Sequence, residues 1–125
     1  MNYQALSDLL RGMPAKPMRG YANTCASRID DETIAITFYD TNILYFQRDG
    51  TFIVAFSEDG KTNEFNTATT RKRLNEFLPE SWQVCNQDHE PYLWMPMGAA
   101  EYQIQGHIVI DPHGEPSELD PFPFN

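Results

Sequence analysis

The feature that most limits the possible folds is the hydrophobic alternation in the first half of the chain. Hydrophobic side chains occupy every second position in residues 33–39, which is the period of a β-strand with one buried face. The runs 42–47 and 51–56 are rich in β-branched and aromatic residues, and Asp49-Gly50 between them is a strong signal for a β-hairpin turn. These segments together predict an antiparallel meander.

Two helices are predicted on either side of this meander. Residues 3–12 place three leucines at helical spacing, and residues 68–79 carry a one-sided hydrophobic stripe that ends at a proline. One of Thr67, Thr69 and Thr70 is expected to cap the second helix, because a threonine hydroxyl can accept a hydrogen bond from a free N–H group of the first turn. Both helices are short, so each must pack on the sheet to be stable.

The remaining strands are predicted from runs of the same kind between turn signals. Residues 24–29 are expected to pair with the first strand of the meander, and residues 102–110 to form a single last strand. The other predicted strands are a short one at residues 61–65 and a second hairpin at residues 81–86 and 91–96.

The order of these elements predicts an α+β fold: one twisted antiparallel β-sheet of hairpins with one or two helices packed on a face. Residues 1–111 are expected to form a single domain, in which residues 1–20 are the N-terminal helix and a linker. Residues 112–125 contain four prolines and no periodicity, and are predicted to be an acidic extended tail. The predicted core residues are Ile34, Ile36, Phe38, Val54, Phe56, Leu74, Phe77, Leu78, Trp82 and Val84.

The composition is that of a packed globular protein. Eight Phe, six Tyr and two Trp supply large side chains, and no hydrophobic run approaches the roughly 20 residues of a membrane span. The N-terminus lacks the basic start and continuous apolar stretch of a secretory signal peptide. We therefore expect a soluble cytoplasmic protein without membrane association, in which Cys25 and Cys85 are free thiols.

The net charge of -9 is unevenly distributed along the chain. Residues 1–73 contain all nine Lys and Arg residues and nine acidic residues, whereas residues 74–125 contain nine acidic residues and no basic one. Such an excess can simply keep a protein soluble, or it can imitate the phosphates of DNA and bind a basic partner. The residues assigned to a partner-binding surface are Asp88, Glu90, Glu101, Asp111, Glu115, Glu118 and Asp120.

Arg71, Lys72 and Arg73 form the one cluster of basic residues in the sequence. They could contact phosphates near a helix N-terminus, and they are the alternative binding site. Domains that bind nucleic acids are usually basic over a whole face, however, and this chain is acidic. The cluster is therefore expected to lie on a solvated helix face, and no direct contact with nucleic acid is predicted.

The spacing of the residues predicts neither a catalytic site nor a metal site. His89 and His113 have acidic neighbours, but adjacent residues in a turn rarely bind one ion, and no Cys or His pair has zinc spacing. The sequence also contains no glycine-rich phosphate loop and no nucleophile elbow. We therefore expect no metal, no cofactor and no enzymatic activity.

A motif of the form Thr-Thr-Arg-x-Arg-x-Asn-x-Phe-Leu-Pro spans residues 69–79. With other residues between positions 20 and 95 it resembles a family of small uncharacterised proteins encoded by tailed bacteriophages and prophages. Tyr39 stands where that family usually has a histidine, and residues from Met97 onward fall outside the resemblance. The matching residues are Asn23, Thr24, Thr41, Asn42, Ile43, Thr69, Thr70, Arg71, Arg73, Asn75, Phe77, Leu78, Pro79, Trp82, Val84 and Trp94.

The resemblance and the charge together predict a small acidic phage accessory protein that binds and inhibits a protein of its bacterial host. The expected target is a nucleic-acid-handling defence complex, of the kind blocked by anti-CRISPR or anti-restriction proteins, because such a complex has a basic nucleic-acid-binding surface. Two alternatives stay open: a nucleic-acid-binding module that acts through the basic helix, and a component of the virion or of its assembly.

Overall fold

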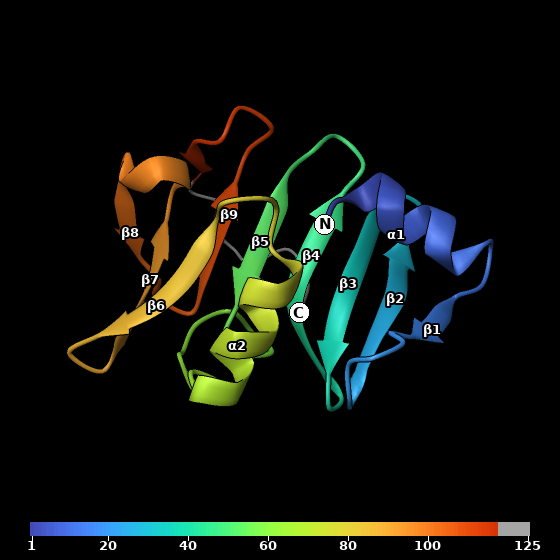
Figure 1. Ribbon diagram of the computed structural model, residues 1–125, viewed down its shortest axis with the longest axis horizontal. Coiled ribbons are helices and arrows are strands. Elements are labelled where there is room, and N and C mark those ends of the chain that lie inside the picture. The colour runs from blue at the N-terminus through green and yellow to red at the C-terminus, as the bar shows by residue number, and fades with distance from the viewer. Residues whose placement is uncertain (118–125) are drawn as a thin grey trace.

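The computed structural model describes residues 1–117, which form an α+β fold with ten strands, two α-helices and a short 3-10 helix (Figure 1). The predicted fold class is confirmed, and β-structure predominates. The strands form two antiparallel sheets rather than the single sheet that was expected. Neither helix in this part of the chain is long and apolar enough to cross a membrane.

The first sheet consists of β1 (Ala15–Pro17), β2 (Thr24–Asp30), β3 (Thr33–Phe38), β4 (Thr41–Gln47), β5 (Phe52–Ala55), β9 (His107–Ile110) and β10 (Pro116–Ser117). They are arranged in the order β1-β2-β3-β4-β5-β9-β10. The predicted meander is confirmed as β3, β4 and β5. Both edge strands are short and begin or end with proline, so neither presents a long row of free backbone groups to another sheet.

The second sheet consists of β6 (Gln83–Gln87), β7 (Glu90–Trp94) and β8 (Glu101–Gln103). The second predicted hairpin is confirmed as β6 and β7. Its turn residues Asp88 and His89 both have positive φ, 51° and 67°, which a type I′ turn requires. A 3-10 turn at Pro96–Gly98 lies between β7 and β8.

The helices α1 (Tyr3–Leu10) and α2 (Ala68–Phe77) cover one face of the first sheet (Figure 1). Thr67 is the threonine that caps α2, since its hydroxyl accepts a hydrogen bond from the Thr70 N–H group. Nine of the ten predicted core residues are buried in one cluster between the helices and the sheets. Trp82, the tenth, is partly buried and packs against that cluster.

The opposite face of the first sheet is also buried at its centre, which the alternation in residues 33–39 did not predict. A single cross-strand row runs through Ala35, Tyr45, Ile53 and Val109. Each of these side chains is at most 3% exposed. The alternation predicts that Ala35 is exposed. Alanine is common on both buried and exposed faces, however, so an alanine at an alternate position does not show which way that face of the strand points.

The predicted last strand, residues 102–110, is divided between the two sheets as β8 and β9. Gly106 lies at the crossing with a φ of +82°, and a Cβ atom there would overlap the backbone of Gly60. The side chain of Asn63 holds the crossing in place, because it accepts from the Gly106 N–H (2.8 Å) and donates to the Ile104 carbonyl (3.1 Å). The chain therefore changes sheets where only glycine fits.

Three further expectations are corrected by the structure. Residues 13–20 are not only a linker, because they include the edge strand β1. Residues 61–65 form no strand. This loop contacts the Gly106 crossing through the Asn63 side chain and not through a β-ladder. Residues 112–117, expected in the tail, form a turn and the strand β10 that pairs with β9.

Asn75 connects α2 to the second sheet. Its Nδ2 donates to the Val84 carbonyl (3.0 Å), and its Oδ1 accepts from the Val84 N–H group (2.7 Å). Val84 lies on β6, an edge strand of the three-stranded sheet. The side-chain amide therefore takes the place of a neighbouring strand at an edge that would otherwise have free backbone groups.

We expect Gly106→Ala to lower the free energy of unfolding by about 3 kcal/mol or more, because the new Cβ would overlap the Gly60 backbone at a strained φ. Chemical denaturation measures the loss. Gly20→Ala is the matched control: Gly20 has a φ of +88°, but nothing lies within 4 Å of its Cβ position. The control should lose only the backbone strain, about 1–2 kcal/mol. Equal losses would mean that the close approach is not needed.

We expect Asn75→Ala to lower the free energy of unfolding by about 1–3 kcal/mol, because both backbone groups of buried Val84 lose their partner. Lys72→Ala, at an exposed position of the same helix, should stay within about 0.5 kcal/mol of the parent protein. Thermal or chemical denaturation of the two variants compares them directly. An Asn75 variant as stable as the Lys72 variant would contradict this role of the amide.

Candidate functional site

The second sheet has one face toward the core and one toward solvent. Val84 and Leu93 point into the core. Cross-strand pairing places Trp94 beside Glu101 on the opposite face. This outer face of the second sheet consists of Gln83, Cys85, Gln87, Glu90, Tyr92, Trp94, Glu101 and Gln103. It therefore brings together Glu90 and Glu101, two of the acidic residues assigned to a partner-binding surface.

Trp94 and Glu101 are held together by hydrogen bonds at the end of this face that lies away from the β6–β7 turn. Trp94 Nε1 donates to Glu101 Oε2 at 3.1 Å, and Gln87 Nε2 donates to the same oxygen at 3.2 Å. The Trp94 side chain is nevertheless 38% exposed. A tryptophan that is both oriented and exposed can act as an anchor in a protein interface, where this residue type is enriched.

A hollow of about 370 Å³ lies beside this pair and is lined by Trp94, Gly98, Ala100 and Glu101. Gly98 has no side chain and Ala100 has only a methyl group, so neither residue fills the hollow. Met97 in the adjoining 3-10 turn is fully exposed and has a φ of 62°, which residues with a side chain seldom adopt. An exposed methionine adds flexible, polarisable contact area next to the indole ring.

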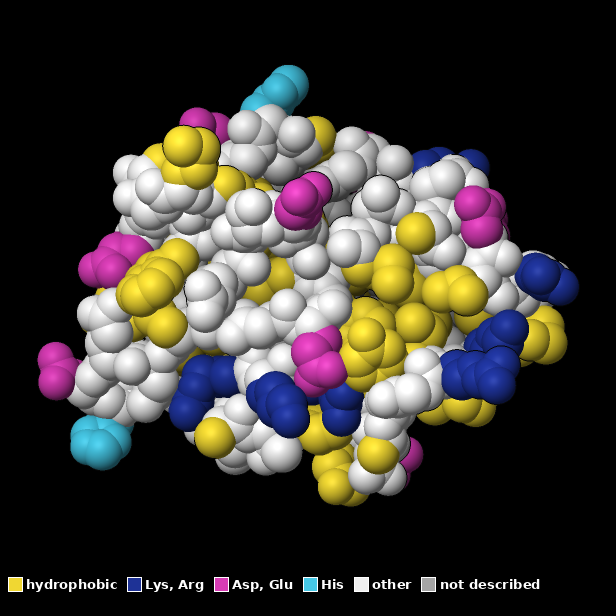
Figure 2. Space-filling model, in the orientation of Figure 1, with side chains coloured by type: hydrophobic (Ala, Val, Ile, Leu, Met, Phe, Trp, Pro, Cys, Tyr) yellow, Lys and Arg dark blue, Asp and Glu magenta, His cyan; other side chains and the backbone are white. Residues whose placement is uncertain are grey.

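The charged side chains on the strands of the second sheet are of one sign. No Lys or Arg occurs after Arg73 in the sequence, so the three strands of the second sheet carry none. In Figure 2, Lys and Arg side chains gather along the lower side, over α2, and at the right, over α1 and β1. Asp and Glu side chains lie at the left edge, over β6–β8, and also near the centre and at the right of this view. The outer face therefore combines acidic and aromatic side chains on strands without Lys or Arg.

The other predicted acidic residues are divided between separate places. Asp88 lies at the tip of the β6–β7 hairpin, at one end of the outer face. Asp111 and Glu115 lie in the turn between β9 and β10, whose Gly114 lies beside Trp82, the residue that precedes β6. Glu118 and Asp120 lie outside the residues that the structure describes. The described acidic residues therefore come from two elements, the second sheet and the β9–β10 turn.

Asp111 has a local role in its turn. Its Oδ1 accepts hydrogen bonds from the N–H groups of His113 (2.8 Å) and Glu115 (3.0 Å). These backbone hydrogen bonds, that of Glu115 first, lower the pKa of the Asp111 carboxyl below its ordinary value. The carboxylate therefore organises the β9–β10 turn, in the way that aspartate side chains commonly stabilise turns.

The basic cluster on α2 is less solvated than the sequence predicted. Arg71 donates to the side chain of Asn66, and Arg73 pairs with Glu76 at 3.3 Å with its side chain only 16% exposed. The Arg73 guanidinium also lies 5.3 Å and 5.4 Å from the centres of two aromatic rings. Lys72 is the exposed member of the three. Two of the predicted phosphate-binding residues are thus engaged within the protein.

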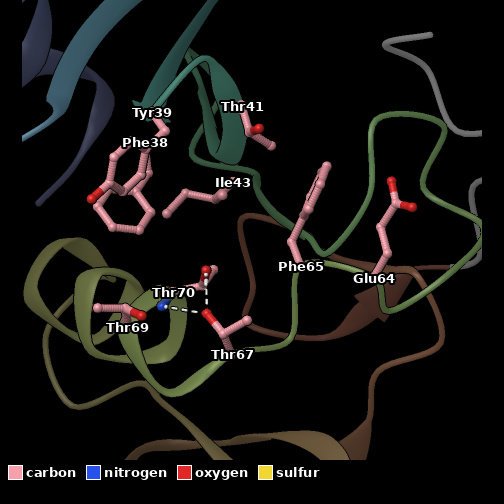
Figure 3. A pocket seen from close by; sticks show the side chains of 9 residues that line it. All are labelled: Phe38, Tyr39, Thr41, Ile43, Glu64, Phe65, Thr67, Thr69 and Thr70. Carbon is pink, nitrogen blue, oxygen red and sulfur yellow. Dashed lines mark hydrogen bonds between the residues drawn. The ribbon is translucent and has the colours of Figure 1, made fainter.

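A second hollow of about 250 Å³ lies between the β3–β4 turn, the loop before α2 and the start of that helix (Figure 3). Phe38, Tyr39 and Ile43 form one wall, and the capping hydroxyl of Thr67 is already hydrogen-bonded to Thr70. Among the residues that the structure describes, Glu64 is the only carboxylate in the lining, and no His, Cys, Lys or Arg lines it. The hollow therefore lacks the paired groups that acid–base or nucleophilic catalysis uses.

The histidines and cysteines do not come together into a metal site among residues 1–117, where no three His, Cys, Asp or Glu side chains are grouped to hold an ion. Cys25 and Cys85 are free thiols on different sheets. Burial raises the pKa of the Cys85 thiol, which favours its protonated form. The Nδ1 atom of His107 lies 2.7 Å from the Gly60 carbonyl oxygen, a contact inside the fold.

The aromatic part of the outer face was missed in the sequence. Trp94 was identified as a position in the motif that resembles the phage family and, with Leu93, as a candidate to pack on the second helix, and Met97 was placed outside that resemblance. The alternation in residues 91–96 could have indicated this aromatic surface, because Tyr92 and Trp94 alternate with Leu93 and so lie on the opposite face of the strand. Leu93 is the buried member of that run, so the two aromatic side chains must face outward.

Comparisons of the chain with protein-family models, with curated proteins and with solved structures gave no match. The geometry of the outer face is therefore the basis for a functional proposal.

We expect the stability difference between the parent protein and Asp111→Asn to depend on pH. Because the pKa of Asp111 is lowered on folding, its carboxylate stabilises the fold above the ordinary aspartate pKa, and this contribution is lost as the pH falls through the lower folded value. Asparagine can still accept the turn hydrogen bonds but does not titrate. The variant should be less stable at neutral pH, and the difference should shrink in acid. Denaturation curves across this range measure it, and a constant difference would contradict it.

Proposed function

We propose that this protein is a small acidic accessory protein that binds and inhibits a host protein through the outer face of its second sheet. The observation that carries the proposal is the hydrogen-bonded pair of Trp94 and Glu101 on a face without Lys or Arg. Interfaces combine a few exposed aromatic anchors with charges that complement the partner. The partner that fits this face has a basic surface.

The mechanism of inhibition is occupation of that basic surface. Glu90, Glu101 and Asp88 lie on one small sheet whose inner face is packed on the core, so their backbone positions are fixed. Carboxylates held in this way can replace nucleic-acid phosphates in a positively charged channel. Their charge also accelerates the encounter, because opposite charges attract over about a Debye length before contact.

The phage resemblance of the sequence supports the choice of partner. We propose a host nucleic-acid-handling defence complex, of the type that anti-CRISPR or anti-restriction proteins inhibit, and hence action in the cytoplasm of a bacterial host. The net charge of -9 supports the same choice, since an acidic protein is repelled by nucleic acid and attracted by proteins that bind it.

Direct nucleic-acid binding through α2 has less support. Arg71 and Arg73 are engaged by Asn66 and Glu76, and the contacts of Arg73 with two aromatic rings hold it against the core. An extended phosphate-binding face would need several free basic residues, whereas only Lys72 of this cluster is exposed.

We expect the tagged protein to capture a host protein from a bacterial lysate, and Asp88→Asn with Glu90→Gln to slow its association with that purified partner. At low salt the on-rate should fall about two- to fivefold, and the rate should depend less steeply on salt, because fewer charges steer the encounter. Surface plasmon resonance at two ionic strengths measures both quantities. The bound partner should also lose its nucleic-acid-dependent activity.

The matched control is Asp31→Asn with Asp40→Asn, which removes two exposed carboxylates from turns of the first sheet. The control should retain the on-rate and salt dependence of the parent protein. The proposal would be wrong if both double variants behaved alike, or if the captured protein kept its activity in the complex. A gel shift of DNA or RNA by this protein alone would favour the nucleic-acid-binding alternative.

A further inference from the structure

We propose that the hollow beside Trp94 and Glu101 is a recognition site for one arginine side chain of the partner. This inference rests on the proposed function and names the chemistry of the same surface. It assigns the hollow to a guanidinium group, which would stack on the indole ring and pair with the carboxylate.

The carboxylate of Glu101 is oriented and has one oxygen to spare. Its Oε2 atom accepts both internal hydrogen bonds, from Trp94 and from Gln87. Among residues 1–117, no donor is bonded to Oε1, so this oxygen can accept from a ligand. The two internal bonds also hold the carboxylate beside the indole ring, which reduces the entropy that would be lost when a ligand is bound.

The indole ring supplies the second half of the site. Tryptophan has the strongest attraction of the aromatic side chains for a cation placed over its face. The ring is exposed, and the hollow beside it is lined by Gly98 and Ala100, whose small size leaves room for a flat group. Gly98 has a φ of +67°, a conformation that glycine adopts without strain.

Arginine matches these two halves better than lysine does. Its guanidinium is planar, stacks on aromatic rings and carries several N–H donors that can reach a carboxylate at the edge of the ring. The ammonium group of lysine is compact and strongly hydrated, so it gains less from stacking. Arginine is also a frequent anchor in interfaces and in surfaces that bind phosphates, which is the kind of partner proposed above.

The site can be tested without the partner, because the two tryptophans give two indole N–H signals in a nitrogen–proton correlation spectrum. The full-length protein is titrated with a short arginine-rich peptide and with a lysine-rich peptide of the same length and charge. We expect the Trp94 signal to shift with the arginine peptide at concentrations about tenfold lower than with the lysine peptide, while the Trp82 signal changes little.

Two variants remove one half of the site each. Glu101→Gln keeps an oxygen that can accept from Trp94 and Gln87 but loses the negative charge, and Trp94→Leu keeps apolar bulk but loses the ring. Each should weaken binding of the arginine peptide about tenfold. Binding by the Trp94 variant is followed through the backbone signals of Gly98 and Ala100. Glu58→Gln, which makes the same change of charge on an exposed loop of the first sheet, should bind like the parent protein.

Three results would overturn the inference: equal affinity for the two peptides, arginine binding that survives Glu101→Gln, or the same loss for Glu58→Gln as for Glu101→Gln. The last result would mean that net charge alone attracts the peptide.

A failure of the proposed function gives a different set of results. In that case no host protein is inhibited, whereas the arginine peptide still shifts the Trp94 signal. If a host protein is inhibited equally by the parent, Trp94→Leu and Glu101→Gln proteins, the arginine site is wrong, and inhibition by this acidic protein stands but uses residues other than this pair.

Discussion

The arrangement of the two sheets depends on the close backbone contact at Gly106. The chain leaves the second sheet there and enters the first, where β9 pairs with β5. A side chain at this position would overlap the loop that contains Gly60, and Asn63 from the same loop bonds to the backbone on both sides of the crossing. β9 is inserted between β5 and β10, so the strand that directly follows the second sheet in the chain belongs to the first sheet.

The second sheet can present a rigid surface because it is also attached to the rest of the fold away from Gly106. Its inner face packs on the core through Val84 and Leu93, and the Asn75 amide fixes its edge strand to α2. The outer face is therefore free to carry side chains that the fold does not use. Trp94 and Glu101 are ordered by a hydrogen bond to each other rather than by burial, which leaves the ring and one carboxylate oxygen accessible.

The charges of the protein have different roles in its two parts. Several basic residues stabilise the fold: Arg28 and Arg48 both donate to the Tyr3 hydroxyl, and Arg73 is held between Glu76 and two aromatic rings. Residues of the α2 motif at positions 69–79 also stabilise the fold, with Asn75 bonding the second sheet and Phe77 filling the core. The acidic residues of the second sheet have no such counter-charges on their own strands, so their field acts on other molecules.

The sequence by itself determined the helices, the two hairpins and the main core, because these follow from local periodicity and turn residues. The Asp49-Gly50 turn needs only its neighbours, and the stripe that contains Leu74 must face the sheet whichever strands form it. The tertiary structure alone decided that residues 102–110 divide between two sheets, since that depends on a contact with a loop more than forty residues away. It also decided which acidic residues share a surface with Trp94. Strand parity places a side chain on one of two faces, but only packing decides which face meets solvent.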